Sequence, residues 1–124
     1  MSKRLTLLLV IVLLAALPLA VPRVARAIPP MPSTFWGTVR VGGAYVPEGT
    51  VISVWSGGTK WLETTTIYYD TGSEVQTLYS VDVPGDDPET GQVEGPTAGA
   101  ILQFRIHLGG QEIIADQTGV WQSG

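Results

Sequence analysis

The single histidine, His107, is the first residue to test for catalysis, because an imidazole beside an acid and a hydroxyl can act as a general base. In residues 102–108 it alternates with apolar residues, so it falls on the polar side of a strand beside Arg105. Nothing near it in sequence forms a nucleophile elbow or a pair of metal ligands. We therefore expect a solvated strand histidine. The alternative, a secreted hydrolase, needs a pocket that joins His107 to an acid and a hydroxyl.

Carboxylates crowd into residues 82–94, and oxygen ligands from such a segment are what Ca²⁺ requires. Asp82, Asp86 and Asp87 are the candidate calcium ligands, although their spacing does not match the EF-hand pattern. The alternative, which we favour, is that Asp86 and Asp87 accept hydrogen bonds from their own backbone in a turn. No other cofactor is expected.

Aromatic residues form the third candidate site. Trp36, Trp55 and Trp61 lie in the first three extended runs, where exposed rings can stack on sugars or anchor a partner protein. Packing explains these rings as well, because a small domain needs aromatic residues to build its core. The three tryptophans are therefore kept as candidate ligand-binding residues.

The N-terminal segment indicates the compartment. Lys3 and Arg4 precede an uncharged apolar run over residues 5–21, and Ala25-Arg26-Ala27 offers a cleavage site. We expect a signal peptide over residues 1–27, a proline-rich segment over 28–34 and a domain over 35–124, in a protein that is secreted or held at the cell envelope. The competing interpretation is that the apolar run is retained as a membrane anchor.

Charge narrows the class of partner. Residues 28–124 hold three basic and eleven acidic side chains, a net charge of −8, so nucleic acid is not an expected partner. The chain has no cysteine, which excludes disulfides, thiolate metal sites and a lipid anchor through an N-terminal cysteine. An unknown protein or glycan at the cell surface is the expected partner.

Glycine and proline divide the rest of the chain into short runs rich in β-branched and aromatic residues, without helical periodicity. Gly42-Gly43 and Gly109-Gly110 are expected turns, and residues 84–99 are expected to form a long loop. The predicted strands are 35–41, 51–55, 61–69, 77–83, 100–108, 111–115 and 118–121.

These runs predict an all-β fold, an antiparallel β-sandwich of about seven strands, because two packed sheets cover the apolar side of each strand. Period-2 alternation gives the expected core. It consists of Phe35, Val39, Val41, Ile52, Val54, Tyr79, Val81, Leu102, Phe104 and Ile106. The run 61–69 alternates too irregularly for its inward side to be assigned.

Three segments carry a resemblance to a known family. Residues 37–51 read Gly-Thr-Val-Arg-Val-Gly-Gly-Ala-Tyr-Val-Pro-Glu-Gly-Thr-Val, residues 79–88 read Tyr-Ser-Val-Asp-Val-Pro-Gly-Asp-Asp-Pro, and residues 115–124 read Ala-Asp-Gln-Thr-Gly-Val-Trp-Gln-Ser-Gly. These segments resemble carboxypeptidase regulatory-like modules of prokaryotic secreted proteins. The resemblance implies a transthyretin-like or Ig-like sandwich that is not an enzyme and is often one unit of a longer surface protein. The expected function is thus structural, adhesive or binding, with carbohydrate binding as the alternative.

Overall fold

The computed structural model describes residues 28–124, and in this range the chain is all-β with no helix. The signal peptide predicted for residues 1–27 lies outside the described residues. The strands are β1 Ser33–Thr38, β2 Arg40–Val41, β3 Ala44–Tyr45, β4 Val51–Ser56, β5 Thr59–Thr65, β6 Ile67–Asp70, β7 Val75–Val83, β8 Ile101–Leu108 and β9 Gln111–Val120. The prediction of an all-β fold is confirmed.

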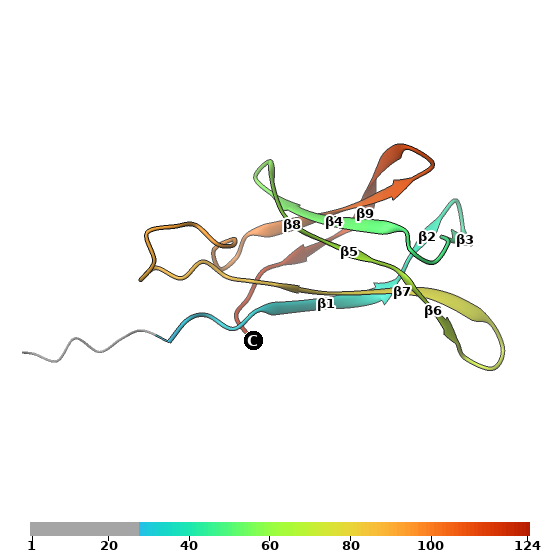
Figure 1. The fold of residues 1–124 in the computed structure, drawn as a ribbon, viewed down its shortest axis with the longest axis horizontal. Helices are drawn as coiled ribbons and strands as arrows, with labels where there is room; N and C mark the ends of the chain where they lie inside the picture. Colours follow the sequence, from blue (N-terminus) through green and yellow to red (C-terminus); the bar gives the residue numbers. More distant parts are fainter. Residues whose placement is uncertain (1–27) are drawn as a thin grey trace, which may run out of the picture.

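All strand pairs are antiparallel and form two larger sheets and one small hairpin. One sheet has the order β1-β7-β6, the other has the order β5-β4-β8-β9, and β2 pairs with β3. Figure 1 shows the two larger sheets as layers that face each other, with the β2–β3 hairpin at one end.

The core lies between these layers because inward side chains from both sheets meet there. Val81 comes from the three-stranded sheet, whereas Ile52, Val54, Leu102 and Ile106 come from the four-stranded sheet. Alternation along β8 is regular: Leu102, Phe104 and Ile106 are buried, and the residues between them are partly exposed. This is the period-2 pattern of a strand with one covered side.

All ten predicted core residues belong to this core. Seven are buried, and Phe35, Val41 and Tyr79 are partly buried and pack against them. The prediction missed Val46, Val83 and Trp121, which are also buried. Trp121 donates a hydrogen bond from Nε1 to the carbonyl oxygen of Val83 at 2.9 Å, which places the C-terminal end of the chain against the end of β7.

Four of the predicted strands differ in the structure. The run 35–41 is not one strand, because it divides at the buried Val39 into β1 and β2, which belong to different sheets. The run 61–69 is not one strand, because it divides at the buried Thr66 into β5 and β6, which belong to different sheets. The runs 111–115 and 118–121 are not two strands, because β9 is continuous from Gln111 to Val120 with an irregularity in its pairing. Backbone pairing with β8 holds both halves of β9 in one sheet.

The glycine turns form as predicted. Gly109 and Gly110 have φ angles of 59° and 77°, and Leu108 pairs with Gln111 across them. Positive φ at both central positions is what a two-residue hairpin of this kind requires. Residues 84–99 form the predicted long loop, which is fastened to the C-terminal segment by hydrogen bonds between Gly99 and Trp121 (2.9 Å) and between Trp121 and Ala100 (2.9 Å).

Candidate functional site

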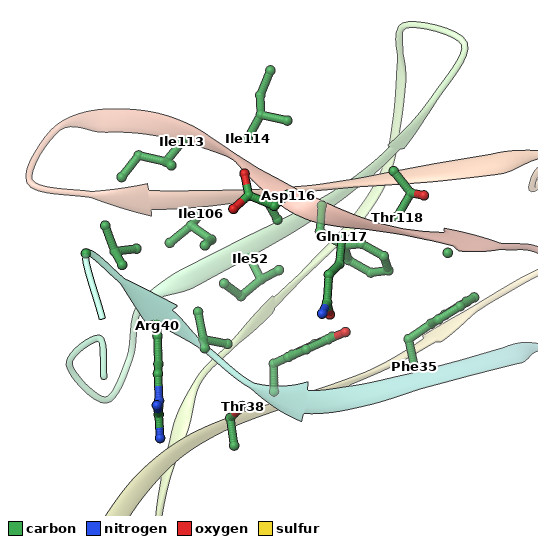
Figure 2. A pocket seen from close by; sticks show the side chains of 17 residues that line it. Phe35, Thr38, Arg40, Ile52, Ile106, Ile113, Ile114, Asp116, Gln117 and Thr118 are labelled. Carbon is green, nitrogen blue, oxygen red and sulfur yellow. The ribbon is translucent and has the colours of Figure 1, made fainter. Parts of the chain in front are cut away.

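A cleft of about 610 Å³ lies between the edges of the two larger sheets. Its walls are β1 and β2 on one side and β9 on the other, and we name it the β1–β9 cleft (Figure 2). Apolar side chains from both sheets line it, including Phe35, Ile52, Phe104, Ile106 and Ile113. Ligand pockets in proteins have volumes of about 300–1,000 Å³, so this cleft is large enough to hold a ligand.

The cleft is open because the two sheets are joined on their opposite side. There the chain passes from β5 in one sheet to β6 in the other through Thr66, whose Oγ1 donates to the carbonyl of Pro47 at 2.9 Å. One end of the cleft is closed by contact between β9 and β1. A Cβ atom on Gly119 would lie only 2.5 Å from Cε1 of Phe35, so a glycine is needed for this approach.

The aromatic part of the floor is a packed cluster. The rings of Phe35 and Phe104 lie 5.6 Å apart edge to face, and those of Tyr79 and Phe104 lie 5.8 Å apart. Such geometries are favourable for aromatic pairs. Burial raises the pKa of the Tyr79 phenol, because the charged phenolate is disfavoured away from water. The phenol is therefore a neutral hydrogen-bonding group of the cleft.

An irregularity of β9 shapes one rim. Gln103 pairs with Thr118 but Arg105 pairs with Ile114, so Ala115, Asp116 and Gln117 together face the single residue Phe104 on β8. Such a bulge bends the strand and re-aims its side chains. In Figure 2 the Gln117 side chain extends from β9 into the space between the sheets, and Asp116 lies on the same rim.

The opposite rim carries Arg40 on β2. Its guanidinium lies over the ring of Tyr45, 4.2 Å from the centroid, and donates a hydrogen bond to Tyr45 Oη. This hydrogen bond raises the pKa of Arg40, with a further contribution from the charge of Glu74. Figure 2 shows the Arg40 side chain pointing away from the apolar floor, so its charge is used outside the cleft.

His107 lies elsewhere, on the outer side of the four-stranded sheet. Its Nε2 is 2.8 Å from Oγ of Ser53, which also accepts a hydrogen bond from Nε1 of Trp55 at 2.8 Å. Arg105 lies over the Trp55 ring at 3.8 Å. His107 is therefore partly buried in a polar network, whereas sequence patterning predicted a solvated side chain.

This network joins a histidine to a hydroxyl but is not built for nucleophilic attack. Ser53 is 0 % exposed, and its Oγ already accepts a hydrogen bond from Nε1 of Trp55. Glu63 lies opposite Ser53 on β5 and forms an ion pair with Lys60 at 2.6 Å. Glu112 lies opposite His107 on β9 and forms an ion pair with Arg105 at 2.5 Å. The hydrogen bond from Lys60 lowers the pKa of Glu63. Neither Ser53 nor His107 lines the β1–β9 cleft.

A structural role for Ser53 gives a testable result. We expect Ser53→Ala to lower the free energy of unfolding by about 1–3 kcal/mol, because the indole N–H of Trp55 and the imidazole of His107 lose a shared partner. Urea denaturation measures this change. Ser80→Ala, at an exposed serine on β7, is the matched control and should change stability by less than about 0.5 kcal/mol. Equal effects of the two substitutions would contradict the role given to Ser53.

The three candidate tryptophans do not come together as one site. Trp55 is held by Ser53 and Arg105, and Trp61 donates from Nε1 to Oγ of Ser56 at 2.7 Å. Trp36 is 76 % exposed on the three-stranded sheet. The pairing of β1 with β7 places Trp36 diagonally across from Leu78, and Leu78 in turn pairs with Ile67 on β6, so these three apolar side chains lie on the same side of the sheet. Of the three tryptophans, only Trp36 is free to meet a ligand with its whole ring.

The candidate calcium ligands are also separated by their contacts. Asp82 accepts a hydrogen bond from Oγ1 of Thr34 at 2.7 Å, Asp86 accepts from the backbone N–H of Glu94 at 3.3 Å, and Asp87 accepts from the backbone N–H of Glu89 at 3.0 Å. Residues 28–124 contain no group of three or more histidine or acidic side chains placed to hold a metal ion. Only the bond from Glu89 to Asp87, two residues apart, is of the local turn kind that the sequence predicts, whereas the bond from Glu94 to Asp86 spans eight residues and Asp82 bonds a side chain on β1.

The loop hydrogen bonds lead to an expected thermal result. The melting temperature should be the same in a chelator, in millimolar Ca²⁺ and in NaCl of matched ionic strength, because the aspartates already bond protein groups. A bound ion at a hundred times its Kd would instead add about 2.7 kcal/mol of stability. Differential scanning calorimetry distinguishes the two, and a rise in Ca²⁺ alone that Asp86→Asn with Asp87→Asn abolishes would establish the calcium site.

Sequence reasoning predicted Phe35, Ile52, Phe104 and Ile106 of the β1–β9 cleft as core residues, but it predicted neither Ile113 nor the cleft itself. Within residues 28–124 the chain has no helix with the length and hydropathy needed to cross a membrane.

Comparison of the chain with models of known protein families, with curated proteins and with solved protein structures gives no match.

Proposed function

We propose that this chain is a secreted β-sandwich module without catalytic activity that binds a partner at the cell envelope. The observation that carries the proposal is the β1–β9 cleft, a cavity of about 610 Å³ with apolar residues in its floor and polar residues on its rims. The partly buried side chains of Phe35, Val41 and Ile113 in its lining keep some apolar surface in water, which a partner would cover. The similarity of residues 37–51 to carboxypeptidase regulatory-like modules agrees with this function.

The polar network at His107 supports binding over hydrolysis. A serine nucleophile needs an exposed hydroxyl, a base and an acid that orients the base. Here the hydroxyl of Ser53 is buried, and the nearby acids Glu63 and Glu112 pair with cations. The network stabilises the outer side of the sheet instead.

Two measurements test the proposed function. N-terminal sequencing of the exported protein should begin at Ile28, as the cleavage motif Ala25-Arg26-Ala27 requires, and a chain that stays inside the cell with Met1 intact would contradict export.

The purified protein should bind isolated cell envelopes of its source with a saturable isotherm that His107→Ala leaves unchanged. Release of soluble products that depends on His107 would show an enzyme instead.

Carbohydrate binding is the second candidate, and a specific observation favours it. Trp36 is exposed on a sheet surface whose neighbouring side chains include the hydroxyls of Thr34, Thr38 and Ser80. An aromatic ring beside hydroxyl groups and the carboxylate of Asp82, which accepts a hydrogen bond from Thr34, suits a sugar ring. Binding of soluble polysaccharides that Trp36→Ala abolishes would support this candidate, and binding that survives the substitution would reject it.

A further inference from the structure

The rims of the β1–β9 cleft are edges of sheets. Among residues 28–124, β1 pairs with β7 alone and β9 pairs with β8 alone, so each strand has a second edge without a partner strand. An unpaired edge offers a row of N–H and C=O groups to an incoming strand. In this cleft the two edges border a common apolar floor.

The bulge in β9 places three consecutive residues without regular pairing to β8 at the centre of one rim. Ala115, Asp116 and Gln117 have no Cα partner on β8 other than the single residue Phe104 that they share. The Gln117 side chain reaches into the cleft and has no hydrogen bond within the described part of the chain (Figure 2). A segment lying along β9 therefore meets main-chain groups, an amide side chain and apolar side chains together.

The charges around the β1–β9 cleft indicate which kind of ligand it binds. Asp116 on this rim is exposed and forms no ion pair among residues 28–124, where the ion pairs are Lys60 with Glu63 and Arg105 with Glu112. Arg40 is directed at Tyr45 and away from the floor. With a net charge of −8 over residues 28–124, the surroundings attract a basic ligand.

We propose that the β1–β9 cleft binds an extended polypeptide segment of a partner protein, which adds as a strand to β9 and places a lysine or arginine at Asp116. Every second side chain of the segment is apolar and enters the floor, as alternation in a strand requires. This inference rests on the proposed function and names the class of partner.

A second copy of this chain fits the same edge less well. Antiparallel pairing of β9 with its own copy about a two-fold axis at Asp116 would bring two Asp116 carboxylates together. Like charges placed directly across a strand pair are destabilising, and the bulge interrupts the straight edge that such pairing uses. A basic segment of a partner protein brings no like charge to Asp116 and does not need a straight edge along the whole of β9.

Selection from a displayed library of random decapeptides tests the proposal with the purified protein. We expect enriched peptides to alternate apolar residues with lysine or arginine. Asp116→Lys should weaken their binding at least tenfold, whereas Glu48→Lys, an acid outside the cleft, should leave it within twofold. Hydrogen exchange with an enriched peptide bound should slow at the amides of residues 115–118.

Other outcomes overturn the proposal. They are a failure to enrich any peptide, enrichment of acidic or uncharged peptides, equal effects of Asp116→Lys and Glu48→Lys, or amide protection confined to a surface other than the cleft. A dimer in sedimentation that the enriched peptides do not dissociate would make a second copy the occupant. The proposed function fails separately, because it requires saturable binding to envelopes whatever the ligand's class.

Discussion

Replacing Trp121 with alanine should lower the free energy of unfolding by about 3–5 kcal/mol, the largest stability loss expected for one substitution in this chain. The side chain is 2 % exposed and is part of the buried core. Its Nε1 donates to the carbonyl of Val83, and its backbone bonds Gly99 and Ala100. Truncation removes ring contacts and leaves a buried carbonyl without its partner.

Trp36→Ala is the matched control for Trp121→Ala. Trp36 is 76 % exposed, so its removal should change stability by less than about 0.5 kcal/mol. Urea denaturation followed by circular dichroism gives both values. A loss at Trp121 no larger than that at Trp36 would show that the C-terminal segment does not hold the two sheets together.

Gly95→Ala should lower the free energy of unfolding by about 3 kcal/mol, at the upper end of the usual range for overpacking. A Cβ atom at this buried position would lie 2.0 Å from the carbonyl oxygen of Pro84 and 2.7 Å from its carbonyl carbon. Both obstacles are backbone atoms, so no side-chain rotation relieves the clash. The loop must move away from the end of β7.

Gly91→Ala tests whether that cost comes from the clash. A Cβ atom at Gly91 has no heavy atom within 4 Å among the described residues, and its φ is not positive. Alanine there should therefore be neutral or slightly stabilising, since it reduces the freedom of the unfolded chain. Thermal unfolding of the two variants compares them directly, and equal melting temperatures would contradict the packing of Gly95 against Pro84.

Much of the fold could be predicted from the sequence because alternation and glycine turns are local signals. The run 102–108 shows its buried side in every second residue, and Gly109-Gly110 marks the hairpin that follows. Trp121 was missed because the predicted strand 118–121, which it ends, is too short to show which side faces inward, and its burial depends on Val83, a partner far away in sequence. Thr66 was missed as a strand boundary because the division depends on which sheet each half joins.

The candidate sites were predicted less well, because each depends on register between strands. Ser53 lies beside His107 only because β4 pairs with β8, and neither residue signals the other in sequence. The cleft depends on which strands are edges, which alternation does not reveal.

Binding of cell envelopes by a variant with a blocked cleft tests the central claim most directly. Gln117→Trp should fill the β1–β9 cleft from its rim, and Gln92→Trp introduces the same ring in the loop outside the cleft. Both glutamines are exposed, so both variants should fold, as circular dichroism can verify. We predict that Gln92→Trp binds like the unmodified protein and that Gln117→Trp binds at least tenfold more weakly. Unchanged binding by folded Gln117→Trp would contradict the assignment of the cleft as the binding site.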